Sequence, residues 1–319
     1  MKRSCLIYGS DGFDADVLLN LRAFYRLLGY SVFHSRRLYP SDLLVLQRPP
    51  NRNLSFDSYH AIHIFDYVGT PLNDLLTGIL DDARVVIFCS SRARTESTLA
   101  AHPCLEGRVV TLPPPVIPSL WELRPQEPDL RIVHVGNYKP FYSDDSDAFA
   151  VRFLSTLQRE LVQVWGHQWP NGIGIQHGPV GISRVSSLYS RARWALGMMY
   201  PWQRATTFSG RFWHAPLNGC ALISEPGTCV AAVPGVMETD YSEASIEDLL
   251  RRGPGDPRAI REAAHRYWSH KCLKSIETVT TLAPQGQSSI PFQAGSFRRV
   301  SVRRIENRAQ LTARRLLRH

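Results

Sequence analysis

The segment TTFSGRFWHAPLNGCALISEP, residues 206 to 226, contains residue types that bind phosphate groups. Ser209 and Gly210 come directly before a predicted short helix, and Arg211 begins it. The amides at a helix N-terminus attract anions, a glycine lets the main chain approach a ligand closely, and an arginine neutralises phosphate charge. We therefore predict a phosphate contact from these three residues. The alternative is an ordinary helix start with a solvated arginine.

The same segment continues with a turn and a strand. Asn218-Gly219 is a pair that forms tight turns with positive φ, and the apolar residues 220–223 after it are a predicted buried strand. In parallel sheets, the loops that gather beyond the carboxyl ends of the strands hold the ligand. We therefore predict that Asn218 and Gly219 belong to the same binding site as Arg211.

Two further predicted strands end in glycine. IVHVGNYK places Gly136 at a strand end and Lys139 three residues later, and VQVWG ends in Trp165 and Gly166. A basic group beside a strand-end glycine suits an anion, and an aromatic ring can stack on a base or a sugar. All four residues are predicted to contact the ligand. The alternatives are a loop with a surface lysine and ordinary aromatic packing.

Two aspartates are candidates for a catalytic base. Asp11, in YGSDGFD, follows the first predicted strand, and Asp66, in FDYVG, lies near the end of another. A carboxylate at such a position can take a proton from an attacking hydroxyl group in an inverting reaction. The alternative for the first is a turn and helix cap, with Asp14 as the cap. The sequence has no G-x-S-x-G, H-E-x-x-H or P-loop motif, which argues against the hydrolases that such motifs mark.

These residues lie on alternating strands and helices. Apolar runs predict strands at 4–9, 31–36, 42–47, 60–68, 84–91, 107–118, 131–138, 162–166, 195–201 and 220–223. Helical spacing predicts helices at 14–30, 72–83, 93–102, 147–161, 182–194, 211–217, 244–252 and 257–283. This alternation predicts an α/β protein with mainly parallel sheets that helices cover on both faces.

A chain of 319 residues is long enough for two domains. We predict an N-terminal domain at 1–118, a proline-rich linker at 119–130, a C-terminal domain at 131–283 and a basic tail at 284–319. The net charge is +9, and most of it comes from the eight arginines between Phe297 and the C-terminus. The tail is expected to bind an anionic membrane surface or DNA, or to be an ordinary solvated terminus.

The composition is that of a globular protein, with 44% hydrophobic and 20% charged residues. No apolar run reaches the roughly 18 residues that span a bilayer, and the apolar run at the N-terminus is too short for a signal peptide. We therefore predict a cytoplasmic protein, with peripheral attachment to the inner face of a membrane as an option. The six cysteines form no CxxC pair, which disfavours zinc and redox sites.

Three motifs together resemble the C-terminal domain of GT-B-type glycosyltransferases, in the family four-like and spore-maturation-protein groups. They are IVHVGNYK, VQVWGHQW with the following HGPVGISRVSSLYSRARWALGMM, and SGRFWHAPLNGCALISEP. In the first half, HIFDYVGTPL, ARVVIFCSS and RVVTLPPPV look like the acceptor domain. The resemblance covers roughly residues 1 to 283. It implies two Rossmann-like domains facing a cleft, with the nucleotide-sugar donor bound by the C-terminal domain.

The resemblance implies a glycosyltransferase that transfers a sugar from a UDP- or GDP-sugar, without a cofactor or a fixed metal, to an acceptor glycan, lipid-linked molecule or polymer. His214 stands where such enzymes carry the glutamate that receives the donor ribose. The same position is expected either to contact the donor or to be a core histidine. Two other functions stay open: a phage-type enzyme that modifies DNA bases, and an inactive glycosyltransferase-like accessory protein.

Overall fold

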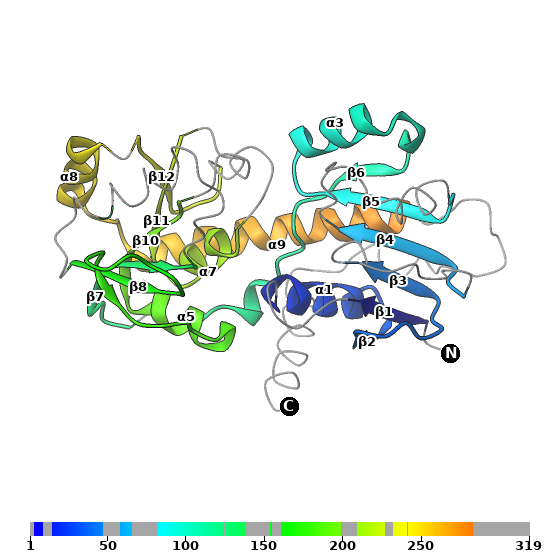
Figure 1. Ribbon diagram of the computed structural model, residues 1–319, viewed down its shortest axis with the longest axis horizontal. Helices are drawn as coiled ribbons and strands as arrows, with labels where there is room; N and C mark the ends of the chain where they lie inside the picture. The colour runs from blue at the N-terminus through cyan, green and yellow to red at the C-terminus, as the bar shows by residue number, and fades with distance from the viewer. Residues whose placement is uncertain are drawn as a thin grey trace. The chain divides into compact units, whose positions relative to one another are not determined.

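The computed structural model describes residues 3–8, 15–46, 58–65, 82–123, 126–137, 154, 161–198, 209–226, 232–240 and 242–282 (Figure 1). The chain forms two compact units. Unit 1 consists of Met1–Leu120 and Ser269–His319, and unit 2 consists of Trp121–Trp268. Each unit has one six-stranded sheet whose neighbouring strands all run parallel. The predicted α/β class is therefore confirmed.

The sheet of unit 1 has the strand order β2-β1-β3-β4-β5-β6. Its strands are β1 (Ser4–Tyr8), β2 (Ser31–Ser35), β3 (Leu43–Leu46), β4 (Ala61–Phe65), β5 (Val85–Cys89) and β6 (Val109–Thr111). Its helical elements are α1 (Ala15–Leu27), α3 (Arg92–Ala101), η1 (Pro103–Leu105) and η2 (Pro118–Leu120). From β1 the chain first adds β2 on one side and then adds β3, β4, β5 and β6 in turn on the other side, which is the strand order of a doubly wound sheet.

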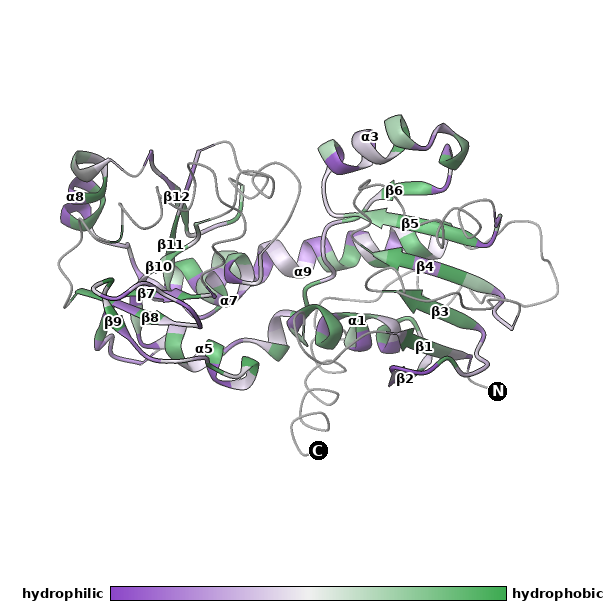
Figure 2. Cartoon of the chain, in the orientation of Figure 1, coloured by the Kyte–Doolittle hydropathy of each residue, from purple (hydrophilic) through white to green (hydrophobic). Residues whose placement is uncertain are grey.

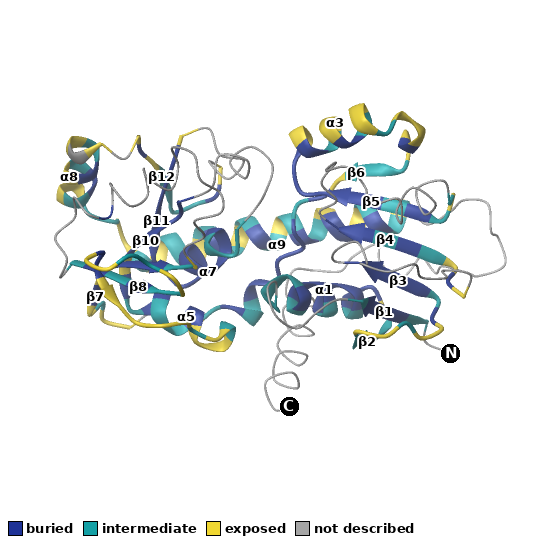
Figure 3. Cartoon of the chain, in the orientation of Figure 1, coloured by how far each residue is buried: buried dark blue, intermediate teal, exposed yellow. Residues whose placement is uncertain are grey.

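The central strands of unit 1 are hydrophobic (Figure 2) and buried (Figure 3). Helix α1 covers the sheet with Leu21, Phe24 and Tyr25, which belong to one apolar cluster with Ile7 and Val45 of the strands. Residues three and four positions apart lie on the same face of a helix, so this spacing gives α1 one buried side. The apolar periodicity of the sequence thus accounts for the packing.

Helix α9 (Pro257–Thr281) takes part in both units. Its first part belongs to unit 2, where Trp268 packs edge-on against Trp213. Its last part belongs to unit 1, where Cys272, Ile276 and Val279 join the apolar cluster of α1. The predicted C-terminal domain at 131–283 includes the whole helix, whereas the last part of the helix belongs to unit 1. Helical spacing predicts that a helix forms, but it does not predict the sheet on which each part of it packs.

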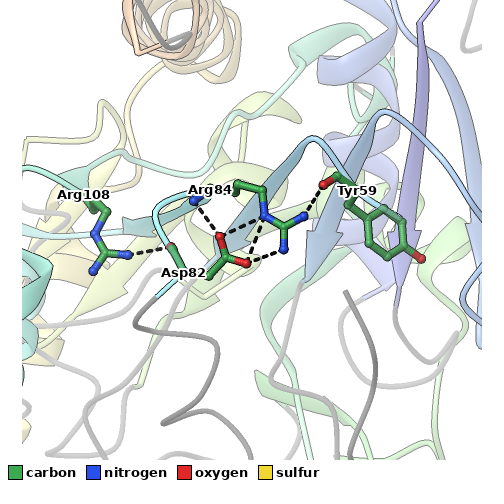
Figure 4. A network of polar contacts seen from close by, with 4 residues as sticks. All are labelled: Tyr59, Asp82, Arg84 and Arg108. Atoms are coloured by element: carbon green, nitrogen blue, oxygen red, sulfur yellow. Dashed lines mark hydrogen bonds and ion pairs between the residues drawn. The ribbon is translucent and has the colours of Figure 1, made fainter. Parts of the chain in front are cut away.

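A polar network fixes the edge of the unit 1 sheet at which β4, β5 and β6 begin (Figure 4). The carboxylate of Asp82 accepts hydrogen bonds from the amide and the guanidinium of Arg84, and its main-chain carbonyl accepts one from Arg108. Arg84 also donates to the carbonyl of Tyr59 at 2.7 Å. The bond from Arg84 lowers the pKa of Asp82. This edge is opposite the one at which parallel sheets bind ligands.

The sheet of unit 2 has the strand order β12-β11-β10-β7-β8-β9. Its strands are β7 (Leu130–Val135), β8 (Val162–Trp165), β9 (Ile175–Gln176), β10 (Ala192–Leu196), β11 (Ala221–Ser224) and β12 (Val236–Glu238). Besides the first part of α9, its helices are α5 (Ile182–Ser190), α7 (Arg211–Leu217) and α8 (Glu243–Arg252). The core contains Ile132, Trp194 and Ile223 from three adjacent strands.

The predicted boundary between a helix at 182–194 and a strand at 195–201 is wrong. Helix α5 ends at Ser190, and strand β10 begins at Ala192. Trp194, predicted as helical, pairs with Ile132 of β7 and Ala221 of β11 and is 2% exposed. A strand with partners on both sides overrides the local helical spacing. The short strands β9 and β12 were not predicted, because two and three residues are too few to show a period.

The predicted helices 72–83 and 147–161 and the tail 284–319 fall almost entirely outside the described residues. Within the described ranges, the protein has no helix whose length and apolar character would suit a bilayer crossing.

Candidate functional site

The candidate site lies at the carboxyl ends of strands β7 and β10. These strands are neighbours in the unit 2 sheet, but the chain visits β8 and β9 on one side of β7 before it returns to β10 on the other. Open parallel sheets bind their ligands at this reversal, beyond the carboxyl ends of the strands. The loops that begin there start at Gly136 after β7 and at Gly197 after β10.

Arg211 spans this reversal point. Its Nη1 donates to the carbonyl of Val135 at 3.0 Å, and its Nη2 donates to the carbonyl of Met198 at 2.7 Å. Val135 ends β7, and Met198 follows β10 by two residues, so one guanidinium connects the two strand ends. Each Nη carries two hydrogens, which leaves a second N–H on each. The predicted basic group is therefore at the edge where an anion would bind.

The start of helix α7 differs from the prediction in one respect. The amides of Phe212 and Trp213 donate to the carbonyls of Ser209 and Gly210, and the amide of His214 also donates to Gly210. These three N–H groups are engaged within the chain, because the first hydrogen-bonded turn begins at Ser209 and not at Arg211 as predicted. Ser209 and Gly210 are half-buried and lie directly before Arg211. The guanidinium and the amides of Gly210 and Arg211 are therefore the groups at this end that can attract an anion.

Gly136 and Gly166 are held together at the ends of β7 and β8. A Cβ on Gly166 would lie 2.0 Å from the carbonyl oxygen of Gly136, so only a glycine fits there. The same oxygen accepts a hydrogen bond from Nε1 of Trp169 at 2.8 Å. A Cβ on Gly136 would lie 2.7 Å from Nη1 of Arg211. The structure therefore brings Gly136, Gly166 and Arg211 together.

His134 is a residue of this edge that the sequence analysis missed. It is 4% exposed, and its Nδ1 lies 3.2 Å from the carbonyl oxygen of Leu196, at the end of β10. Burial, and secondarily the charge of Arg211, lower the pKa of His134 to about 3, so the ring is neutral. The sequence feature that could have identified this residue is a histidine between two valines, directly before the loop that begins at Gly136.

Trp165 ends β8 and is half-buried. Its ring stacks on that of His177, with centroids 4.3 Å apart and planes 9° apart. Nε2 of His177 in turn lies 2.9 Å from Oε1 of Gln163. One face of the indole is thus covered by His177, so the predicted stacking on a base or sugar would have to use the other face.

His214 and Asn218 lie in the interior of unit 2. The His214 ring is 2% exposed, packs edge-on against Trp121 at 4.4 Å and lies 3.5 Å from the hydroxyl of Ser186. The Asn218 side chain donates to the carbonyls of Trp121 and His214 and accepts from the amide of Leu123. These contacts fix residues 121–123 to the end of helix α7. The structure does not bring either side chain to the edge that Arg211 spans.

Gly219 forms the turn that the sequence predicted. Its φ is +80°, and a Cβ would lie 2.7 Å from the carbonyl oxygen of Pro257. The amide of Cys220 donates to Ala215, and that of Gly219 donates to Pro216, which is the Schellman pattern at a helix end. This glycine therefore ends helix α7 and returns the chain to the sheet.

Asp11, Asp66 and Lys139 lie outside the described residues. Strand β1 ends three residues before Asp11, and strand β4 ends one residue before Asp66. In the part of the chain that the structure describes, no three His, Cys, Asp or Glu side chains gather in a way that could hold a metal ion.

No protein-family model and no curated protein matches this sequence. Among solved structures, the chain is similar to AviGT4, a glycosyltransferase involved in avilamycin A biosynthesis, with 16% identity, a TM-score of 0.59 and coverage of 88% of this chain and 96% of that chain. A variant of T4 phage BGT in complex with UDP-glucose shows 12% identity, a TM-score of 0.64 and coverage of 88% and 99%. An α-glucosyltransferase in complex with UDP and a 13-mer DNA containing an HMU base shows 12% identity, a TM-score of 0.61 and coverage of 89% and 100%. The chain has the fold of GT-B glycosyltransferases.

Proposed function

We propose that this protein is a glycosyltransferase that transfers a sugar from a nucleotide-sugar donor to an acceptor hydroxyl group. The observation that carries the proposal is the position of Arg211, whose guanidinium joins the carboxyl ends of β7 and β10 at the reversal point of the unit 2 sheet. A fold shared with glycosyltransferases supports it. Within these enzymes, we assign the chain to the family four-like and spore-maturation-protein groups on the three sequence motifs.

Arg211 has the chemistry that the reaction needs at the donor. When the sugar leaves the nucleotide, negative charge develops on the diphosphate, and a fixed cation stabilises that charge. The two main-chain hydrogen bonds hold the guanidinium in place before the donor binds, so little reorganisation is needed. Gly136 carries no side chain at this edge, which lets the donor approach the main chain, and Gly166 makes room for the carbonyl of Gly136. Lys139 is proposed to add a second positive charge.

UDP is the first nucleotide to test. The structures similar to this chain include complexes with UDP-glucose and with UDP, and one of them also contains Mn²⁺. We propose that this protein needs no resident cofactor or fixed metal, because Arg211 supplies the positive charge. Transfer that continues in EDTA would support metal independence, whereas transfer that stops in EDTA and returns with Mn²⁺ would refute it.

Isothermal titration with UDP-glucose and GDP-mannose tests donor binding. Arg211→Ala should weaken the affinity for the bound donor roughly tenfold or more, because a charge-assisted hydrogen bond contributes about 1.5–3 kcal/mol. Arg191→Ala is a matched control, since Arg191 pairs with Asp129 at the opposite ends of the same two strands and is partly exposed. Equal affinity in the wild type and the Arg211→Ala variant would refute the donor site.

The acceptor is proposed to be a glycan, a lipid-linked molecule or a polymer bound by unit 1, with Asp11 or Asp66 as the base that activates its hydroxyl group. Replacing each aspartate by Asn should abolish transfer but leave donor affinity unchanged, if that residue is the base. An Asn variant that transfers sugar at the wild-type rate would exclude that aspartate.

We further propose that the basic tail attaches this cytoplasmic protein to an anionic surface. Each arginine near such a surface contributes on the order of 1 kcal/mol. A truncation at residue 284 should lose salt-sensitive binding to anionic vesicles while it keeps donor affinity. Loss of DNA binding instead would favour the enzyme that modifies DNA bases. Absence of any nucleotide-sugar binding would favour the accessory protein.

A further inference from the structure

The protonation of His134 follows from its surroundings. Its Nδ1 faces the carbonyl oxygen of Leu196 at 3.2 Å, and a carbonyl can only accept a hydrogen bond. Nδ1 therefore carries the proton of the neutral ring, and Nε2 carries a lone pair. The charge of Arg211 and the burial of the ring both oppose a second proton on this histidine. Nε2 is thus a hydrogen-bond acceptor.

This acceptor lies beside the cation. The point at which a Cβ of Gly136 would lie is 2.7 Å from Nη1 of Arg211 and 3.2 Å from Nε2 of His134. The two nitrogen atoms are therefore no more than about 6 Å apart, a separation that a single oxygen atom can bridge with two hydrogen bonds. Because residue 136 is a glycine, no side chain fills the space between them. Among the described residues, the ring has one hydrogen bond, through Nδ1, and Nε2 has none.

A donor N–H and an acceptor lone pair side by side select the chemistry of their ligand. A hydroxyl group satisfies both, because its oxygen accepts from Arg211 while its hydrogen is donated to His134. An ionised phosphate oxygen has no hydrogen to donate, so its lone pairs would face that of Nε2. The second N–H on Nη2 of Arg211 remains for the diphosphate. The two ends of one guanidinium can therefore serve two different groups of the ligand.

We propose that His134 is a specificity-determining residue of the donor site, whose Nε2 accepts a hydrogen bond from a hydroxyl group of the nucleotide sugar. The hydroxyl belongs either to the ribose or to the transferred sugar, and the chemistry of the contact is the same for both. This inference rests on the proposed function, since it requires that Arg211 lies at the donor.

Two substitutions separate the two nitrogens of the ring. In His134→Asn, the side-chain amide can replace Nδ1 and keep the bond to Leu196, but nothing replaces Nε2. In His134→Gln, the amide group reaches the position of Nε2 and can supply an acceptor there. Isothermal titration of both variants with UDP, UDP-glucose and inorganic pyrophosphate, together with their melting temperatures, tests the proposal. Gly136→Ala, which fills the space between the two groups, is a second route that leaves His134 intact.

His134→Asn should bind the nucleotide ligand roughly threefold to tenfold more weakly than the wild type, as expected for one neutral hydrogen bond, and His134→Gln should keep most of the affinity. Weaker binding of both UDP and UDP-glucose assigns the hydroxyl to the ribose, and weaker binding of UDP-glucose alone assigns it to the sugar. Pyrophosphate affinity should not change.

Three results would overturn the inference. If folded His134→Asn binds UDP and UDP-glucose as the wild type does, Nε2 contacts no hydroxyl group. If it loses pyrophosphate affinity to the same extent, the contact is with the diphosphate. If Gly136→Ala leaves both nucleotide affinities unchanged, the space between the two groups is not used. In each case the wild type still binds the donor, whereas a wild type that binds no nucleotide sugar refutes the proposed function itself.

Discussion

Replacing Gly136 or Gly166 by alanine should lower the stability of the protein by different amounts, although the two glycines are in contact. At Gly136 the added methyl group would meet the tip of the Arg211 side chain at 2.7 Å, and a flexible side chain can move away. The cost to stability is then about one hydrogen bond, or about 1 kcal/mol. At Gly166 the methyl group would meet the main-chain oxygen of Gly136 at 2.0 Å. The main chain at the end of a strand cannot shift without disturbing the sheet, so we expect the free energy of unfolding to fall by about 1–3 kcal/mol or more.

Donor affinity should fall most in Gly136→Ala, the variant that loses less stability. Gly136→Ala displaces Nη1 of Arg211, so UDP-glucose should bind roughly tenfold more weakly even though the protein stays folded. Urea denaturation measures stability, and isothermal titration on the folded variant measures affinity. Gly172→Ala is a suitable control, because its φ of +90° gives backbone strain without any atom within 4 Å of the new methyl group. If Gly136→Ala binds UDP-glucose as tightly as the wild type, neither Nη1 of Arg211 nor the space beside it contacts the donor.

Burial lowers the pKa of His63 to about 4 and that of His134 to about 3 from about 6.5, so the unfolded chain binds more protons in this range. The two neutral histidines should therefore make their full contribution to the free energy of unfolding above about pH 6.5. This contribution should fall as the pH decreases, by about 2 kcal/mol per histidine at pH 5. A melting temperature that stays constant from pH 7 to 5 would contradict this. Asn218→Ala removes two buried hydrogen bonds to main-chain carbonyls and a partly buried one from the amide of Leu123, so the free energy of unfolding in urea should fall by about 2 kcal/mol. A loss below about 1 kcal/mol would mean that water replaces the side chain. Cys104, the exposed thiol among the described free cysteines, should react first with a thiol reagent under native conditions, whereas the buried Cys5, whose pKa burial raises, should react only on unfolding.

The sequence was sufficient to predict the elements whose local signals and packing agree. Alternating apolar strands and helices predicted the parallel sheets, and the Asn-Gly pair predicted the positive φ at Gly219. The limits of β10 were missed because Ala192, Arg193 and Trp194 continue the helical spacing of α5, and only the pairing with β7 and β11 makes them a strand.

The place of the candidate site in the fold could be proposed from the sequence, but the orientation of its side chains could not. The strand-end glycines and Arg211 were found because backbone geometry and charge leave a local pattern. His214 and Asn218 belong to the same sequence segment, but the residues that bury them, such as Trp121, are distant in the chain. His134 was missed because a single histidine in an apolar strand resembles a core residue until the opposing carbonyl of Leu196 is known.

The division of helix α9 between the two units has a consequence for the order in which the protein folds during synthesis. The core of unit 1 contains Cys272, Ile276 and Val279, which leave the ribosome only after all of unit 2 has been made. Domains of a growing chain usually fold from the N-terminus onward. Here the first sheet must wait, with the apolar face of α1 and its strands incompletely covered, until the last helix is complete. A nascent chain that stalls before residue 269 would therefore expose this surface to aggregation or to chaperones, even though every residue of the first six strands is present.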